Sequence, residues 1–342
     1  MRTAKLQSNA PGNFSEECSQ MKLKALAAIL FLGTLWGTSI LAVRFMVNGT
    51  THPFTFSAMR LIGAASLYLL VGLLRIGGKH FPTGYRLWKF GILMGVADSA
   101  IFVLFATSIS YLSSGVASIM PTLTPVITVL LAHLILKDER LNFWKAIGIA
   151  SSFSGVLLMA ALRESGLPNT ALANPLGYIL GIGGATLTAF MTVLARRKMV
   201  HFEAFSLTSV RFFVAAVVTT IFASLTVGMN FDHFTTQEYL ILGYSSVIFF
   251  VGFFVAFKVI QNFGATVNAL SEYITPIVAT TGGVILFGEH ITHGMLAGLA
   301  MIAFGLVLIN RNVGLEKTTY IPLAEGSLTD LVSVNESGND KN

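Results

Sequence analysis

Two carboxylates fall deep within long apolar stretches of the sequence, Asp98 in one stretch and Glu272 in another. A charge inside a bilayer costs about 2.5–3.5 kcal/mol on insertion scales, so an acid in such a place needs a reason. We interpret Asp98 in two ways. It either loads a proton or binds a cationic substrate, or it is a structural acid, paired with Arg44 or Arg60 or bonded beside a polar kink.

Glu272 precedes Pro276 by four residues. A proline cannot donate a hydrogen bond to the carbonyl four residues earlier, so the carbonyl of Glu272 is left free. We expect this oxygen and the carboxylate to line a cavity, because free polar backbone at membrane depth is tolerated only there. Asn268, Ser271 and Tyr273 lie beside Glu272 and add hydrogen-bonding groups. The alternative for Glu272 is a structural salt bridge.

Three arginines also fall within the apolar stretches. Arg60 and Arg211 occupy corresponding places in the two halves of the chain, which favours a bracing role in the scaffold or snorkelling over contact with a substrate. Arg44 lies near the outer end of its stretch, where its side chain is expected to snorkel to the interface.

Prolines and aromatic residues suggest where the helices bend and where a substrate binds. Pro125 and Pro276 are either moving hinges or static kinks, and Pro121 adds a second break near Pro125. The aromatic residues that either line a pocket or serve only for packing are Trp36, Tyr244 and Phe102.

The sequence contains no motif for an enzyme or an ATP-driven pump. The zinc-protease, serine-hydrolase and phosphate-loop patterns are absent. Glu289, His290 and His293 lie close together in a short outer turn but lack a further set of ligands, so we expect no metal site there. No cofactor is expected.

The composition indicates a membrane protein. Only 11% of the 342 residues are charged, against about 25% in a typical soluble domain. The mean hydropathy is +0.73, and 54% of the residues are hydrophobic. Cys18 is the one cysteine, which excludes an intrachain disulfide. The sequence therefore predicts an all-α integral membrane protein.

The apolar stretches define ten membrane spans, since about 20 apolar residues cross a hydrocarbon core of about 30 Å. Short connections leave no room for a folded soluble domain. The expected spans are residues 24–47, 54–74, 88–110, 113–136, 143–162, 175–195, 203–227, 238–260, 264–287 and 293–310.

Basic residues orient these spans. Of the 22 lysines and arginines, 18 fall outside or at the very ends of spans on one side of the predicted membrane, Arg163 alone falls on the other side, and Arg44, Arg60 and Arg211 lie further inside spans. Because positive charge accumulates in cytoplasmic loops, both termini are predicted to be cytoplasmic. The formal charge of +6 is therefore a topology signal, and no nucleic-acid partner is expected.

The chain contains an internal repeat. Arg60 matches Arg211 and Thr124-Pro125 matches Thr275-Pro276, both at an offset of 151, while Glu139 matches Glu289 at an offset of 150. Gly148 and Gly155 match Gly298 and Gly305, also at 150. Five spans per half is an odd number, so the halves enter the membrane with opposite orientation, as in carriers that work by alternating access. Glu272 falls opposite Pro121, so this acid is asymmetric, which favours a functional role for it.

The motifs resemble those of the drug/metabolite transporter superfamily. They are Trp36-Gly37, Arg60 and Thr124-Pro125, and the Leu136-Lys-Asp-Glu-Arg-Leu141 turn with the glycines after it is similar to the EamA branch. The second half has no Trp-Gly pair and a different acidic turn, Gly288-Glu-His-Ile-Thr292. The resemblance implies a ten-helix exporter or importer of small metabolites, often amino acids or related compounds.

These observations predict five regions. Residues 1–23 form a cytoplasmic N-terminal tail, 24–162 the first EamA-like five-helix repeat, 163–174 an external linker, 175–310 the second repeat and 311–342 a disordered cytoplasmic tail. We expect a secondary active transporter in the plasma membrane or bacterial inner membrane, either proton-coupled or an exchanger, present as a monomer or homodimer. The alternatives are a carrier of nucleotide sugars or cofactors, and a receptor or scaffold that transports nothing.

Overall fold

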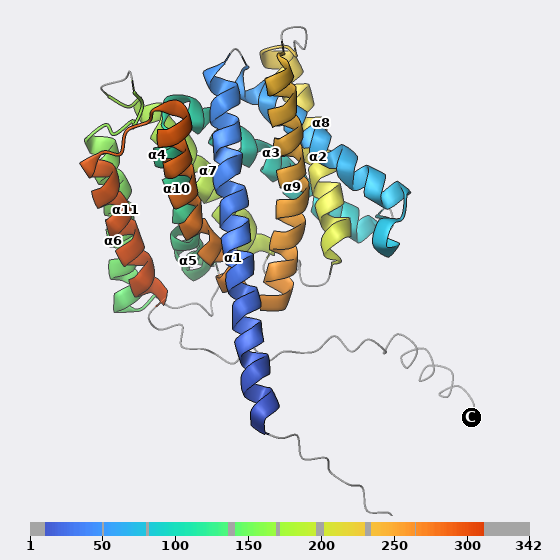
Figure 1. Ribbon diagram of the computed structural model, residues 1–342, viewed down its shortest axis with the longest axis horizontal. Helices are drawn as coiled ribbons and strands as arrows, with labels where there is room; N and C mark the ends of the chain where they lie inside the picture. The colour runs from blue at the N-terminus through green and yellow to red at the C-terminus, as the bar shows by residue number, and fades with distance from the viewer. Residues whose placement is uncertain are drawn as a thin grey trace, which may run out of the picture.

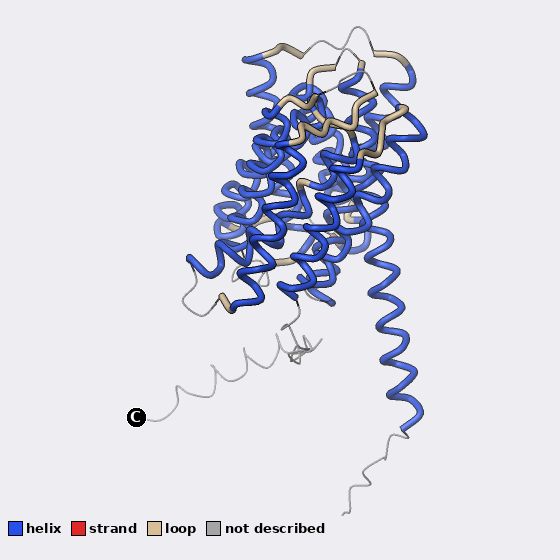
Figure 2. Tube along the Cα trace, turned by 90° about the vertical axis from the view of Figure 1, so that its left-hand side faces the viewer, coloured by secondary structure: helices blue, strands red, loops and turns tan. Residues whose placement is uncertain are grey.

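The computed structural model describes residues 11–49, 51–79, 82–135, 141–168, 172–195, 202–229, 234–263 and 265–310. Within these ranges every regular element is a helix and no strand occurs. Figure 2 shows the helices running side by side along one common direction. Helices suit a lipid environment because each satisfies its backbone hydrogen bonds within its own segment.

The first half of the chain contains six α-helices and two short 3-10 helices. The pieces α4, η2 and α5 together form the fourth expected span. In order, the elements are α1 (Pro11–Asn48), α2 (Pro53–Leu73), η1 (Ile76–Gly78), α3 (Tyr85–Tyr111), α4 (Ser114–Ile119), η2 (Pro121–Leu123), α5 (Thr124–Ile135) and α6 (Phe143–Ala161).

The second half contains five α-helices, each of which corresponds to one expected span. They are α7 (Pro175–Ala195), α8 (Ala204–Thr226), α9 (Thr236–Phe263), α10 (Ala265–Phe287) and α11 (His293–Asn310). Among the described residues, nine segments are long and apolar enough to cross a membrane, and α11 is a shorter apolar helix of 18 residues. The ten predicted spans are thus confirmed, most of them to within three residues at each end.

The largest difference from the prediction lies at the N-terminus. Helix α1 begins at Pro11, whereas the apolar pattern placed the start of the span at residue 24. Proline is favoured in the first turn of a helix, where its missing N–H has no partner to lose. The acidic turn at residues 136–141 lies outside the described residues except for Leu141, as do residues 1–10 and 311–342.

The packing of α6 against α11 shows how the two halves are related. These helices form one edge of the bundle (Figure 1). A Cβ on Gly148 would lie 2.4 Å from the carbonyl oxygen of Gly305, and a Cβ on Gly155 would lie 2.6 Å from that of Gly298. In the repeat, Gly148 corresponds to Gly298 and Gly155 corresponds to Gly305. The Gly148–Gly305 contact is therefore equivalent to the Gly155–Gly298 contact with the two halves exchanged. Gly148, near the start of α6, meets Gly305, near the end of α11, so these two corresponding helices run antiparallel. The repeat is inverted, as predicted.

Replacing Gly148 by leucine should therefore destabilise the protein. The new side chain meets backbone at the α6–α11 crossing, and overpacking of this kind costs about 1–3 kcal/mol. Thermal unfolding of the purified protein in detergent measures the effect. Gly243→Leu is the matched control, because no atom lies within 4 Å of a Cβ at that position. Equal unfolding midpoints for the two variants would contradict the tight crossing.

The remaining helices form two groups on either side of α1. Helix α1 contacts α10 and α9, and Figure 1 shows it between them. Helices α2, α3, α8 and α9 pack around one buried cluster that is rich in phenylalanine. A larger buried cluster is centred on the broken fourth span and includes Leu112, Met120 and Leu123. The candidate site residues are distributed over both groups.

The prolines at corresponding positions have different structural effects. Pro125 is the second residue of α5, where a missing N–H breaks no hydrogen bond of the helix. Pro121 begins the 3-10 helix that interrupts the fourth span. Pro276 instead lies inside the continuous helix α10. The fourth span of the first half is therefore interrupted at Pro121, whereas its counterpart in the second half, α10, is one continuous helix that contains Pro276.

Candidate functional site

Asp98 and Arg211 form a buried ion pair between α3 and α8. Arg211 donates from Nε to Asp98 Oδ2 at 2.9 Å and from its terminal nitrogen to Oδ1 at 3.0 Å. Both residues are at most 8% exposed. Such a two-pronged contact is the strongest arrangement between an arginine and a carboxylate. Asp98 is therefore a paired acid in this structure.

The partner of Asp98 differs from the two arginines considered on the sequence, Arg44 and Arg60. The reason is the close approach of α3 to α8. A Cβ on Gly91 would lie 2.5 Å from Val210 Cγ1, and one on Gly95 would lie 2.6 Å from the carbonyl oxygen of Arg211. Glycines at four-residue spacing signal such an approach, but they do not say which helix approaches.

Arg60 has no comparable partner. Its side chain is buried, with the residue 3% exposed, and its Nε has no hydrogen-bond acceptor among the described residues. The guanidinium carbon lies 4.3 Å from the ring centre of Phe249, 5.3 Å from that of Phe56 and 5.8 Å from that of Phe102. Within the described part of the chain, these ring faces take the place of a carboxylate beside Arg60.

Two of the three predicted pocket aromatics lie in one aromatic cluster. The ring of Trp36 lies 4.9 Å from that of Phe253, and Phe102 lies 5.0 Å from Phe249 and 5.5 Å from Phe253. We call Trp36, Phe102, Phe212, Phe249 and Phe253 the aromatic cluster. Tyr244 is 47% exposed and has no ring contact within the described structure, so it is not brought into this cluster.

Sequence reasoning missed Phe249 and Phe253, although a signal for them exists. They are four residues apart on α9 and therefore lie on one face of that helix. Both contact Phe212 of α8, with ring centres 6.0 Å and 5.0 Å away. In a chain with 27 phenylalanines, this spacing alone did not distinguish them from packing residues.

Glu272 lies on α10. It is partly buried, and its carboxylate has no hydrogen bond or ion pair to any described residue. Asn268, one turn earlier on the same helix face, has a buried amide oxygen that likewise has no partner in the described part of the chain. The Ser271 hydroxyl donates to the carbonyl of Asn268 at 2.7 Å, while Tyr273 packs toward the larger buried cluster. Glu272 and Asn268 thus offer unsatisfied acceptor oxygens one turn apart.

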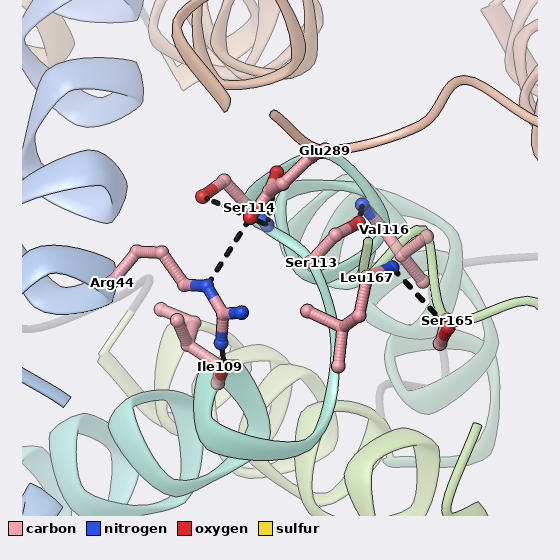
Figure 3. Close-up of polar contacts among 8 residues, drawn as sticks. All are labelled: Arg44, Ile109, Ser113, Ser114, Val116, Ser165, Leu167 and Glu289. Atoms are coloured by element: carbon pink, nitrogen blue, oxygen red, sulfur yellow. Dashed lines mark hydrogen bonds and ion pairs between the residues drawn. The ribbon is translucent and has the colours of Figure 1, made fainter. Parts of the chain in front are cut away.

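A third polar group joins the two halves (Figure 3). It includes Arg44, near the last turn of α1, and so lies at the end of that helix opposite its start. Arg44 Nε lies 3.2 Å from Glu289 Oε1, and Arg44 also donates to the carbonyl of Ile109 at 3.1 Å. The Ser114 backbone N–H, at the first residue of α4, donates to both carboxylate oxygens of Glu289 at 2.9 Å. The Glu289 carboxylate thus binds both an arginine and the start of a helix.

This group corrects the prediction for Arg44. The residue is 7% exposed and paired, so it does not snorkel to the interface. The turn after α10 places Glu289 next to α1, a long-range contact that no local pattern in the sequence indicates. Among the described residues, no group of three or more His, Cys, Asp or Glu side chains is placed to hold a metal ion.

Replacing Glu289 by glutamine should destabilise the protein by about 1.5–3 kcal/mol, the usual contribution of a hydrogen bond to a charged group. The variant keeps one acceptor oxygen for Ser114 but loses the charge that balances Arg44. Unfolding midpoints in detergent report the change. His290→Gln, an exposed neighbour, should stay within about 0.5 kcal/mol of the parent protein. A Glu289→Gln protein as stable as that control would show that the charge contributes nothing.

An exposed ion pair joins the halves at the other end of the bundle. Lys79, which follows η1, contacts Glu203, which precedes α8. Burial raises the pKa of the Glu203 carboxyl, but hydrogen bonds from Lys79 and Ser206 outweigh that effect and hold the pKa below its usual value. Ion pairs that link the two halves therefore occur at both ends of the bundle.

The described structure also has an apolar groove of about 550 Å³ between α5 and α7, lined by residues such as Leu131, Ile179 and Phe190. None of the site residues predicted from the sequence lines this groove. Arg60 and Glu272, which have no ion-pair partner among the described residues, are likewise not among the residues that line it.

Comparison with known proteins places the chain among transporters. A family model described as the EamA-like transporter family matches residues 23–161 and again residues 175–311. An uncharacterized transporter of Archaeoglobus fulgidus is 24% identical over 81% of this chain and 95% of its own length. The uncharacterized inner membrane transporter YedA of Escherichia coli K12 is 24% identical over 84% of this chain and 90% of its own.

Two further similarities agree with that placement. Protein PecM of Dickeya dadantii is 23% identical over 84% of this chain and 92% of its own length. A solved crystal structure superposes with a TM-score of 0.57 at 18% identity, covering 82% of this chain and 94% of the other, which supports the fold alone. The family model covers both halves and most of the chain. The protein is a multi-pass membrane transporter and belongs to the EamA-like transporter family.

Proposed function

We propose that the protein is a secondary active transporter that moves a small organic metabolite, an amino acid or a related compound, by alternating access. The observation that carries this proposal is the antiparallel crossing of α6 and α11 at Gly148–Gly305 and Gly155–Gly298. Two inverted halves can exchange conformations, and that exchange converts an opening at one membrane face into an opening at the other.

The ion pairs between the halves are suited to act as gates. The Lys79–Glu203 pair lies at one end of the bundle, and the Arg44–Glu289 pair with Ser114 lies at the other. Opening either end separates the halves there, so the corresponding pair must break. The Arg44–Glu289 pair is buried, whereas the Lys79–Glu203 pair is exposed. Breaking the buried pair therefore requires more free energy than breaking the exposed pair.

Glu272 is the proposed coupling residue. A partly buried carboxylate without a partner can take up a proton or bind a cationic group such as an ammonium. Its counterpart in the repeat is Pro121, so the acid serves no symmetric bracing role. Asn268 would orient the bound group through its free amide oxygen. In this proposal the protein lies in the cell membrane with both termini in the cytoplasm, as a monomer or homodimer, without a nucleic-acid partner.

Counterflow in proteoliposomes tests the proposal. Vesicles are loaded with one unlabelled compound from a panel of amino acids, keto acids, nucleotide sugars and cofactors, and uptake of the same labelled compound is followed. We expect transient accumulation of at least one amino acid or related compound, and none in protein-free vesicles. Exchange of nucleotide sugars alone would change the substrate class. Absence of exchange across the whole panel would support a receptor or scaffold instead.

A further inference from the structure

Arg60 and Arg211 occupy equivalent positions, yet their surroundings differ. Under the repeat, α2 corresponds to α8 and α3 corresponds to α9. Arg211 of α8 pairs with Asp98 of α3, so the equivalent contact joins Arg60 of α2 to a residue of α9. Adding the offset of 151 to position 98 gives position 249, which is Phe249. The guanidinium of Arg60 does lie against that ring, at 4.3 Å.

Close approaches at the helix crossings agree with this alignment in α9. A Cβ on Gly95 of α3 would lie 2.7 Å from Val214 Cβ of α8. The equivalent positions are 246 on α9 and 63 on α2, and a Cβ on Gly63 would lie 2.7 Å from Ser246 Cβ. The same crossing therefore occurs twice, less than one turn from the arginine contact in each half. The Phe249 ring beside Arg60 therefore occupies the position that corresponds to the Asp98 carboxylate beside Arg211.

The Arg60 guanidinium contacts three ring faces and no carboxylate among the described residues. Each cation–π contact contributes about 0.5–2 kcal/mol, against a cost of about 2.5–3.5 kcal/mol for a cation in a bilayer. The rings carry no negative charge, however, and Nε has no hydrogen-bond acceptor among the described residues. Two hydroxyls nearby are also buried without a hydrogen-bond partner among the described residues, Ser57 on α2 and Ser245 on α9. Each lies about one turn from Arg60 or Phe249 on its helix. Along their helices, both hydroxyls therefore lie within about one turn of the Arg60–Phe249 contact.

We propose that Arg60 binds the carboxylate of the transported molecule, and that Phe249 keeps the arginine free for it. The proposal deepens the function above and rests on it. The Ser57 and Ser245 hydroxyls would donate further hydrogen bonds to the carboxylate, and the aromatic cluster would contact the apolar part of the molecule. The proposed site uses one guanidinium, and one guanidinium matches a singly charged carboxylate better than a phosphate dianion.

Cysteine accessibility tests the proposal without knowledge of the substrate. In a Cys18→Ser protein, Ser57→Cys is labelled in proteoliposomes with sulfonatoethyl or trimethylammonioethyl methanethiosulfonate, and each rate is divided by that of a free thiol. We expect a preference for the anionic reagent of about tenfold, because Arg60 supplies an uncompensated positive potential. Thr208→Cys, the equivalent position beside the paired Arg211, should show no such preference.

Phe249→Asp provides the decisive control. It recreates the ion pair of the other half, so the anion preference of the Ser57→Cys protein should disappear while the protein remains folded. If Ser57→Cys does not fold, Ser245→Cys replaces it. Three outcomes would each overturn the role of Arg60. The thiol at position 57 could prove unreactive, or its preference for the anionic reagent could equal that of the Thr208→Cys protein. The third outcome is a preference for the anionic reagent that persists in the Phe249→Asp variant. Counterflow measured on the parent protein separates these outcomes from failure of the carrier proposal, because exchange would persist when only the role of Arg60 is wrong.

Discussion

Replacing Asp98 by alanine is expected to destabilise the protein by about 3–5 kcal/mol, the usual cost of leaving one member of a buried ion pair without its partner. In the variant, the Arg211 guanidinium stays buried between α3 and α8 and loses both of its hydrogen bonds to the carboxylate. The shift in the unfolding midpoint in detergent, by heat or by SDS, measures the loss.

The double variant Asp98→Ala/Arg211→Met separates the ion pair from simple loss of packing. Replacing a buried pair by apolar groups is often neutral or stabilising, so the double variant should recover most of the lost stability. Lys79→Met, at an exposed ion pair, should change stability by about 0–1 kcal/mol. If the double variant is as unstable as Asp98→Ala alone, the charge balance is not the source of the effect.

Replacing Glu272 by glutamine is expected to reduce transport by about tenfold to a hundredfold, which corresponds to the loss of about 1.5–3 kcal/mol of interaction with a charged group. The same change should leave the unfolding midpoint equal or higher, because the carboxylate has no partner among the described residues and its burial is uncompensated. Counterflow and thermal unfolding of the same preparation provide both quantities.

Glu238→Gln is the matched control for Glu272→Gln. Its carboxylate caps the start of α9 by accepting hydrogen bonds from the backbone and hydroxyl of Thr235. We expect a small loss of stability and normal transport from this control. Normal exchange by the Glu272→Gln protein would remove this residue from the coupling mechanism, and a large fall in its unfolding midpoint would indicate a bracing role.

The sequence predicted the helices well because each span carries its own signal. Apolar length defines a span locally, and the expected ends of α6 and α7 lie within one residue of those observed. The repeat was also readable, because Gly148, Gly155 and their counterparts keep their spacing. The span predicted at residues 24–47 agrees with the apolar part of α1, Leu23–Asn48. Helix α1 itself begins earlier, at Pro11, because a helix can continue beyond the span into a polar segment.

The side-chain partners were harder to predict because they depend on which helices become neighbours. Asp98 was matched with Arg44 or Arg60, but α3 packs against α8 and brings Arg211 to it. The symmetry of Arg60 and Arg211 suggested one shared role, yet the residue that faces each arginine comes from the other half and differs, Asp98 in one case and Phe249 in the other. The repeat in the sequence shows that the two arginines occupy equivalent positions. Whether each charge is balanced depends also on the residue that the arginine contacts, and that residue differs between the halves.

In the proposed alternating-access mechanism, the break in the fourth span makes the inward-facing and outward-facing forms unequal. The first half has separate pieces α4 and α5 around Pro121, whereas the second half has the continuous helix α10. Two structurally identical halves would give inward-facing and outward-facing forms of equal free energy. In that mechanism, unequal halves give the two forms different resting populations, and we expect the half-saturation concentrations for transport to differ between the two faces of the membrane.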